Sequence, residues 1–151
     1  MVKSPPSPSR KTLGNKSRMK RLELPVEITR LVLHAKCEGI LEFKTSSGNL
    51  YEAFFWGKSY NEGEKVLVEL DHLSLPLDWE KTFSLNALKE KKLEKLNGEG
   101  EYAGYGEIEQ VAPIIANFGD IKLNLGNWSN DNRIIGEFIY WRIRRLEVAL
   151  E

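Results

Sequence analysis

The sequence predicts a mainly β domain, a small barrel or sandwich of about seven strands. Three observations indicate this fold: short segments in which apolar and polar residues alternate, glycine-centred turns between them, and a single helix-like stretch. A chain of 151 residues is long enough to bury one hydrophobic core. We therefore expect one domain at residues 22–151, in which two similar β units flank one helix.

The first segment of this domain, residues 26–37, fits two elements. Its β-branched residues, and the lack of a good N-cap before it, favour a strand with a bulge near Arg30. The inward-pointing residues of that strand would be Val26, Ile28, Leu31, Leu33, Ala35 and Cys37. The alternative is a helix with an apolar face at Ile28, Leu31, Val32 and Ala35. We favour the strand.

The remaining strands are predicted more clearly. Residues 39–45 and 50–56 flank a turn at residues 46–49, which is the pattern of a hairpin. Further strands are expected at residues 64–70, 102–111, 114–125 and 134–150. The segment 114–125 is broken by a turn at residues 117–120, and we expect the last strand to be bent or bulged because it is unusually long.

The single helix is predicted at residues 86–96, after a connector at residues 76–83. Asn86 is a suitable N-cap, and Asn97-Gly98 is a suitable C-terminal stop. Four leucines form one apolar stripe at helical spacing, namely Leu85, Leu88, Leu93 and Leu96.

A weak internal repeat relates residues 39–75 to residues 102–150. At an offset of 73 residues, Gly63-Glu64 matches Gly136-Glu137, and apolar strand positions follow in both copies. This pattern supports two similar β units around the helix. By analogy of architecture alone the domain is OB-like, that is, similar to small barrels that bind oligonucleotides, and such an analogy carries little functional weight.

The N-terminal segment differs in composition from the rest of the chain. Residues 1–21 contain seven basic residues, no acidic residue and the proline-rich run Ser4-Pro5-Pro6-Ser7-Pro8-Ser9, so we predict a disordered basic tail. The other residues include 15 basic and 22 acidic side chains, a net charge of −7. Tail residues expected to contact a polyanion are Arg10, Lys11, Lys16, Arg18, Lys20 and Arg21. A solvated tail without function, or a tail docked on its own acidic domain, are the alternatives.

Several functional classes are not supported by the sequence. The only cysteine, Cys37, has no partner for an intramolecular disulfide, and no run approaches the ~20 apolar residues of a membrane span. We therefore expect a cytoplasmic protein without a membrane segment. Phosphate loops, nucleophile elbows and metal-ligand spacings are absent from the sequence, and the only histidines are His34 and His72. We predict no catalytic residue, no metal site and no cofactor, and hence no enzyme.

The candidate binding surface lies in the last predicted strand. By strand alternation, Phe138, Tyr140, Arg142 and Arg144 share one face, and Arg145 adds a further positive charge. Aromatic rings stack on bases and arginines pair with phosphates, so this face is typical of single-stranded nucleic-acid binding. The competing interpretation is that the aromatic residues are covered and that the arginines pair with glutamates across the sheet.

Four loop residues are further candidate contacts, namely Trp128, Arg133, Tyr60 and Lys58. Trp128 lies in a polar loop, where it either contacts a partner or caps the end of the barrel. The aromatic residues at positions 51 and 54–56 are expected to belong mostly to the core.

These patterns predict a non-catalytic binding module, with single-stranded nucleic acid slightly favoured as its ligand. The alternative is a protein-interaction module of inhibitor, immunity or adaptor type, because an acidic domain suits a basic partner. An exposed sheet edge would also allow two copies to pair into an oligomer.

Overall fold

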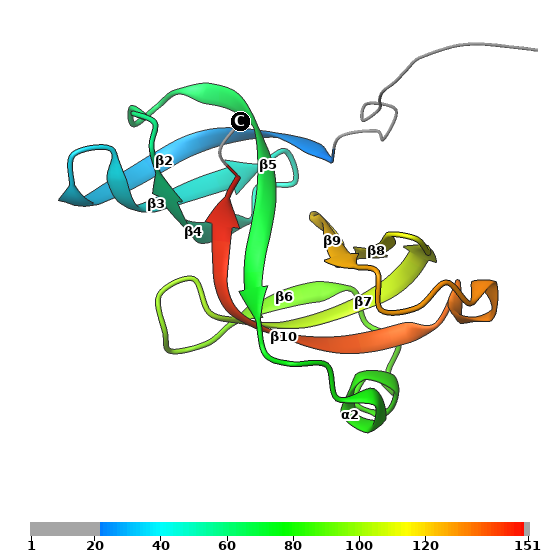
Figure 1. The fold of residues 1–151 in the computed structure, drawn as a ribbon. Helices are drawn as coiled ribbons and strands as arrows, with labels where there is room; N and C mark the ends of the chain where they lie inside the picture. Colours follow the sequence, from blue (N-terminus) through cyan, green and yellow to red (C-terminus); the bar gives the residue numbers. More distant parts are fainter. Residues whose placement is uncertain (1–21, 150–151) are drawn as a thin grey trace, which may run out of the picture.

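The computed structural model describes residues 22–149. These residues form one sheet of nine strands and a short α-helix (Figure 1), and apolar side chains alternate with polar ones along the strands. The strands are β2 (Glu23–Ala35), β3 (Glu38–Thr45), β4 (Leu50–Trp56), β5 (Lys65–Ser74), β6 (Lys92–Lys95), β7 (Tyr102–Gln110), β8 (Ile114–Asn117), β9 (Lys122–Gly126) and β10 (Phe138–Val148). The helix α2 is Trp79–Ser84, and a 3-10 turn, η2, covers Asn132–Ile134. The mainly β class is thus confirmed. About seven strands were expected, and the described residues form nine because residues 114–125 form two strands and β6 was not foreseen.

The order of the strands reveals two Greek keys. Within the sheet the order is β4-β3-β2-β5-β10-β7-β8-β9, and β6 pairs with β7 outside this row. On each side of the central β5–β10 pair, three hairpin-connected strands are followed by a fourth that returns beside the first. This connection defines a Greek key. The first consists of β2 to β5, and the second of β7 to β10.

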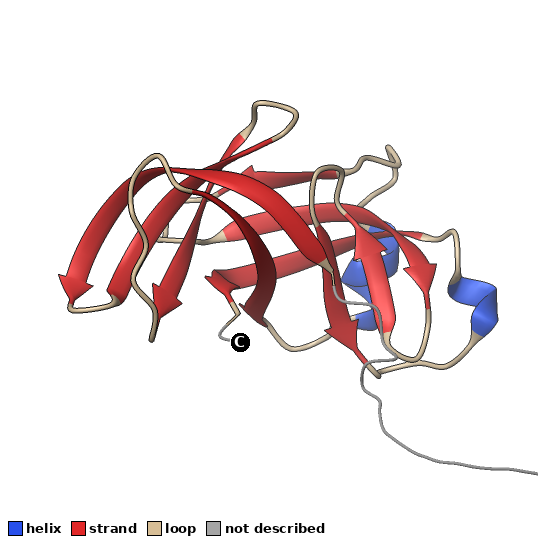
Figure 2. Cartoon of the chain, turned by 90° about the horizontal axis from the view of Figure 1, so that it is seen from above, coloured by secondary structure: helices blue, strands red, loops and turns tan. Residues whose placement is uncertain are grey.

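The first Greek key is closed by the last strand of the chain. β10 pairs with β5 in antiparallel orientation and with β4 in parallel orientation, where Glu147 lies opposite Phe54. Strands β2, β3, β4, β5 and β10 therefore form a ring, and Figure 2 shows how strongly these strands curve.

The two Greek keys share details of their backbone. In each, the amide of an isoleucine donates to the carbonyl of a glutamate, and the glycine before that glutamate donates back to the isoleucine carbonyl. These residues are Ile28, Gly63 and Glu64 in the first Greek key and Ile108, Gly136 and Glu137 in the second. A register shift follows each isoleucine, and both glycines have a positive φ, 86° and 93°. Glycine adopts this conformation without the steric cost of a Cβ atom.

A continuous apolar core runs through both Greek keys. Its most deeply buried side chains include Ile28, Leu41, Phe43, Phe55, Ile108, Phe118, Leu123, Ile139 and Ile143. Val26 and Ile28 contribute to it from β2, Leu31 packs against it, and the predicted bulge is present between Ile28 and Arg30. The prediction that Leu33 and Ala35 point into the core is wrong. Leu33 is 62% exposed, and Ala35 is exposed too, because this end of the β2–β3 hairpin extends beyond the core.

The helix predicted at residues 86–96 is also wrong. The described α-helix lies earlier, in the predicted connector, and its N-cap is Asp78, whose carboxylate accepts from the Lys81 amide at 3.2 Å. Leu85 and Leu88, which begin the predicted apolar stripe, are 50% and 81% exposed.

Asn86 instead organises a loop between α2 and β6. Its side chain is buried and donates to the carbonyls of Glu90, at 2.9 Å, and Ile139, at 3.1 Å. Its Oδ1 accepts from the Glu90 amide at 2.8 Å. These bonds satisfy main-chain groups that a helix would otherwise have paired, and they fix the loop against β10.

Asp120, in the β8–β9 turn, links the two Greek keys. Its carboxylate accepts hydrogen bonds from four side chains at the β3–β4 turn. The donors are Thr45 (3.3 Å), Ser47 (2.8 Å), Asn49 (2.6 Å) and Tyr51 (2.9 Å). Desolvation raises the pKa of Asp120, but the hydrogen bonds outweigh it and hold the pKa below its usual value. The pKa of Tyr51 is raised, mainly by burial and to a smaller extent by the hydrogen bond to Asp120.

We expect Asp120→Asn to lower the free energy of unfolding by about 1–3 kcal/mol at pH 7, because charge-assisted bonds are lost. A carboxyl group whose pKa is lower in the folded state stabilises the fold above its unfolded pKa, near 4, and this stabilisation disappears as the pH falls through the folded pKa. Urea unfolding from pH 7 down to pH 2.5 should therefore show the difference from wild type shrinking. Asp71→Asn, at an exposed position, is the control. A difference independent of pH would contradict this assignment.

Residues outside the described range include the predicted basic tail, residues 1–21, and residues 150–151. No helix within residues 22–149 is long and apolar enough to cross a membrane. The same residues contain no group of three or more histidine, cysteine or carboxylate side chains placed to hold a metal ion.

Candidate nucleic-acid interface

The predicted contact face on β10 is divided between the two Greek keys. Residues 138–143 pair with β7, and residues 143–148 pair with β5. Phe138 and Tyr140 are half-buried in the second Greek key, where the Tyr140 ring packs edge-on against Tyr105, with the ring centroids 5.4 Å apart. The two aromatic residues thus lie on a different part of the surface from Arg145.

Arg142 is held by an acid, as the competing interpretation of this strand expected. Its guanidinium donates to and forms an ion pair with Glu101, which directly precedes β7. That hydrogen bond, supported by one from the Gly98 amide, holds the pKa of Glu101 below its usual value. The same hydrogen bond raises the pKa of Arg142. Arg142 is therefore less available to a phosphate than the sequence indicated.

A bulge changes the direction of the following arginines. Strict alternation would place Arg145 on the core side with Ile143, but the register of β10 against β5 shifts between these two residues. Arg145 consequently faces outward, toward β4. Arg144, the extra residue of the bulge, is exposed and has no ion-pair partner among the described residues.

Arg145 completes a stack of three side chains on the outer face of the ring. Its guanidinium lies 4.1 Å from the centroid of the Phe54 ring, and the Phe54 ring stacks on Trp56 with centroids 5.7 Å apart and an interplanar angle of 29°. We call these residues the Arg145–Phe54–Trp56 stack. Phe54 and Trp56 are neighbours on one side of β4, and both are partly exposed.

Glu147 fixes the arginine end of this stack. Its Oε2 accepts from Arg145 Nε at 2.8 Å and lies 2.6 Å from a terminal guanidinium nitrogen. Glu147 is only 6% exposed, and it lies opposite Phe54 in the parallel β4–β10 pair. The guanidinium plane is therefore held in place over the ring before any ligand arrives.

The predicted loop contacts have different environments. Tyr60 is 8% exposed and packs edge-on against Phe55, so it lies in the core rather than on the surface. Lys58 lies over the Tyr60 ring at 5.4 Å. Arg133 extends into solvent beside Asp131, to which it forms an ion pair at 2.9 Å. These side chains do not join the stack on β4.

Trp128 is partly buried within a cluster of four aromatic side chains. It stacks on Trp141 with centroids 5.8 Å apart, and Trp79 and Phe83 from α2 pack edge-on against it at 5.3 Å and 6.1 Å. Its buried Nε1 has no hydrogen-bond partner. Trp79, at the outer side of the cluster, is 53% exposed.

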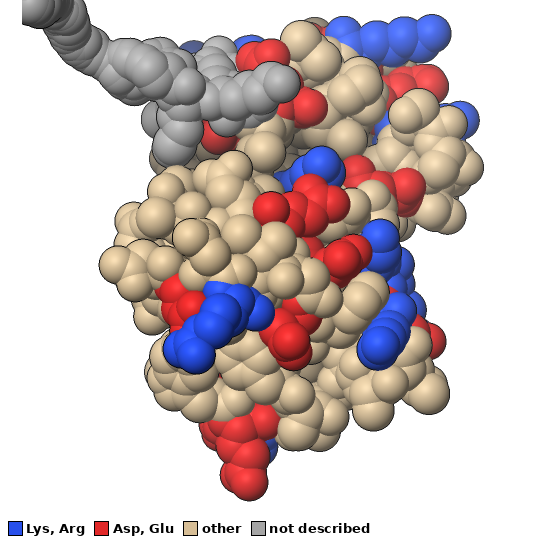
Figure 3. Space-filling model, turned by 90° about the vertical axis from the view of Figure 1, so that its right-hand side faces the viewer, with Lys and Arg blue, Asp and Glu red and all other residues tan. Residues whose placement is uncertain are grey.

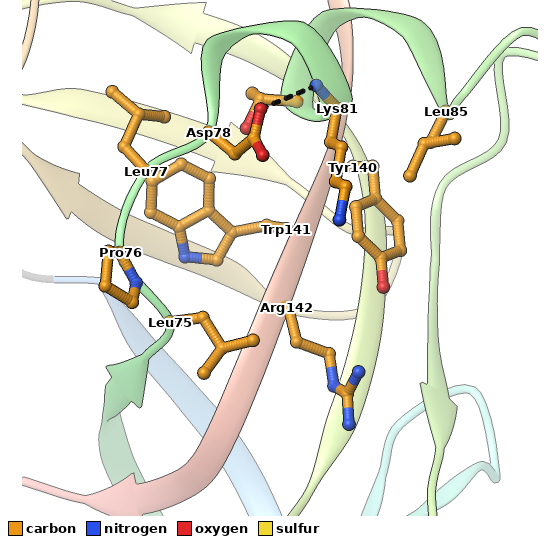
Figure 4. Close-up of a pocket in the computed structure, with 10 residues that line it drawn as sticks. Leu75, Pro76, Leu77, Asp78, Lys81, Leu85, Tyr140, Trp141 and Arg142 are labelled. Atoms are coloured by element: carbon orange, nitrogen blue, oxygen red, sulfur yellow. Dashed lines mark hydrogen bonds between the residues drawn. The ribbon is translucent and has the colours of Figure 1, made fainter.

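Trp141 also lines a groove of about 330 Å³ (Figure 4). We call it the α2 groove. Its lining residues are Leu75, Pro76, Leu77, Asp78, Lys81, Thr82, Leu85, Tyr140, Trp141 and Arg142. Figure 4 shows the Trp141 indole beside the segment from Leu75 to Asp78, Tyr140 and Arg142 on the other side of β10, and Leu85 at the far end of α2.

A chain of hydrogen bonds links Trp141 on β10 to β5 and β9. Trp141 Nε1 donates to Ser74 Oγ at 2.9 Å, Ser74 Oγ is 2.6 Å from His72 Nδ1, and His72 Nε2 is 2.9 Å from the Asn124 carbonyl. Since the carbonyl can only accept, Nε2 carries the proton and Ser74 donates to Nδ1. Both ring nitrogens of His72 are thus occupied by structural bonds between β5 and β9.

Charge on the surface is mixed. Figure 3 shows lysine and arginine side chains among aspartate and glutamate side chains, without a large area of one sign on that face. Any contact with nucleic acid on this face would therefore be local.

Sequence reasoning did not identify Phe54 and Trp56 as site residues, because aromatic residues on a hairpin strand usually belong to the core. Their alternation with Ala53 and Phe55 did place them on a separate face. No protein-family model matches this chain, and no curated protein or solved structure is significantly similar to it.

Proposed function

We propose that this domain is a non-catalytic binding module for single-stranded nucleic acid. The observation that carries the proposal is the Arg145–Phe54–Trp56 stack on the outer face of the ring. An unpaired base has an apolar face that stacks on an indole ring, and this contact needs no particular sequence.

The position of the stack supports the proposal. OB-type barrels are five-stranded Greek-key structures that bind oligonucleotides on the face of their second and third strands. In the ring described above, the second and third strands in chain order are β3 and β4, and Phe54 and Trp56 lie on β4. The analogy of architecture and the position of the aromatic side chains therefore indicate the same face.

The chemistry of the site suggests the role of each residue. Trp56, at the open end of the stack, would receive a base. Arg144 is the phosphate contact, because it is exposed and has no ion-pair partner among the described residues. Arg145 is neutralised by Glu147, so it orients Phe54 and contributes less positive charge to phosphate binding than Arg144 does. With one phosphate contacted by Arg144, log K should fall with log salt at a slope of about −0.7, and a second contact by Arg145 would bring the slope to about −1.4.

Fluorescence anisotropy of labelled single-stranded DNA and RNA, titrated with the full chain at low salt, tests this function. Trp56→Ala should weaken binding about 5- to 100-fold, which corresponds to the loss of one stacked base. Two matched controls lie outside the stack, namely Trp79→Ala, an exposed tryptophan, and Arg133→Ala, an exposed arginine. Both controls should bind as wild type does.

Two outcomes would contradict the proposal. Absence of binding by the wild-type chain at low salt would remove nucleic acid as a ligand. Binding that survives Trp56→Ala but disappears when Lys16, Arg18, Lys20 and Arg21 are replaced by glutamine would assign it to the basic N-terminal segment alone.

A further inference from the structure

The α2 groove has the composition of a site for a proline-rich peptide. Such peptides adopt an extended left-handed helix with three residues per turn, and they bind in grooves lined by aromatic side chains. Tyr140 and Trp141 both line the α2 groove, and Figure 4 shows the Trp141 indole beside Pro76 and Leu77 and the Tyr140 ring across β10, toward Leu85. Trp128 stacks on Trp141 with ring centroids 5.8 Å apart, and this contact helps to hold the Trp141 indole in place.

The chain itself contains a segment of matching chemistry. In the sequence Pro5-Pro6-Ser7-Pro8-Ser9-Arg10-Lys11, two prolines are three residues apart and a basic pair follows. Prolines at this spacing lie on one side of the extended helix, so both can enter one groove. We infer that residues 4–11 of this chain bind in the α2 groove.

Charge at the groove supports this occupant. Asp78 and Glu80, at the start of α2, are both exposed, and they offer carboxylates to Arg10 and Lys11. Two cations also line the groove, namely Lys81 and Arg142, but Arg142 is already neutralised by Glu101. Among the lining side chains the carboxylate of Asp78 thus faces one unneutralised cation, Lys81, and Glu80, elsewhere on α2, adds a second exposed carboxylate.

The length of the N-terminal segment allows the contact within one molecule. The described chain begins at Leu22, which lies near Asp120 and Ile121. An extended chain covers ~3.3 Å per residue, so the residues between Leu22 and Pro8 span about 45 Å. A domain of this size is roughly 40 Å across. Residues 4–11 can thus reach the groove although α2 and the start of β2 lie at opposite ends of the molecule in Figure 1.

Competition with an added peptide tests the inference. A fluorescein-labelled peptide of residues 1–12 is titrated with the full chain and with a full-length Pro5→Ala/Pro6→Ala/Pro8→Ala variant. A tethered segment that fills the groove nine-tenths of the time reduces the apparent affinity for an added peptide about tenfold. The proline variant should therefore bind the peptide about tenfold more tightly than wild type. A Ser4→Ala/Ser7→Ala/Ser9→Ala variant, which keeps the prolines, should behave as wild type.

A second pair of variants tests whether the added peptide binds in the α2 groove. Both variants are made in the chain that carries the three proline substitutions. Leu85→Glu alters a half-exposed lining residue and should abolish peptide binding, whereas Leu88→Glu, at a more exposed position outside the groove, should not. Equal binding by wild type and the proline variant, no binding by either, or binding retained in Leu85→Glu would each overturn the inference. If the wild-type chain forms a dimer in solution, loss of the dimer in the proline variant would support the same contact made between two copies. A dimer that persists in the proline variant would mean that another surface of the second copy covers the groove, and this would overturn the inference.

Discussion

We expect Phe118→Ala to lower the free energy of unfolding by about 3–5 kcal/mol, the range for a large buried aromatic side chain. Phe118, in the β8–β9 turn, is 1% exposed. Its ring fills a hollow over β7 that exists because Gly104 and Gly106 have no side chains. A Cβ atom at either position would lie 2.8 Å from the ring. Neighbouring glycines cannot extend into the space left by the ring, so the cavity would persist. Urea denaturation followed by circular dichroism gives the value, and Leu88→Ala, 81% exposed, should change it little.

The hollow itself is tested by Gly104→Ala. The added methyl group would collide with the Phe118 ring, and we expect a loss of about 1–3 kcal/mol. In the double variant with Phe118→Ala, the loss should be smaller than the sum of the two single losses by at least about 0.5 kcal/mol, because the collision has been removed. Strict additivity would mean that the ring and the glycine do not share this space.

The second large effect is expected at Asn86. Asn86→Ala should lower the free energy of unfolding by about 2–4 kcal/mol, because it removes the side-chain hydrogen bonds to the buried carbonyl of Ile139 and to the part-buried carbonyl and amide of Glu90. Asn97→Ala, at an exposed loop position, serves as the matched control and should have an effect below about 0.5 kcal/mol. A small effect at Asn86 would mean that the loop before β6 is held by other contacts.

Local patterns predicted most of the strands. Alternation and glycine turns located the β3–β4 hairpin and the break between β8 and β9, and the β-branched residues of β2 indicated both the strand and its bulge. The predicted helix at residues 86–96 failed for an identifiable reason. A leucine stripe and an asparagine N-cap are local signals, but the Asn86 amide binds Ile139, 53 residues later in the chain, and β6 pairs with β7. Tertiary hydrogen bonds thus overrode a modest helical preference.

The candidate site was predicted only in part for a similar reason. Arg144 and Arg145 could be named from the sequence, because a cationic strand end is visible in the residue pattern. Their position beside Phe54 could not, since it depends on the parallel pairing of β10 with β4 and on a one-residue bulge. Neither feature has a signature in the spacing of apolar residues.

The shared use of β10 also constrains when the protein can fold during synthesis. The ring of the first Greek key closes only with β10, which begins at Phe138, long after β5 ends at Ser74. Strands β2 to β5 are therefore synthesised before their closing partner exists, and they remain unpaired along one side until β10 has been made. At about 5–20 residues per second, the interval between β5 and β10 lasts several seconds. During that interval the exposed strand edges are open to chaperones or to neighbouring chains.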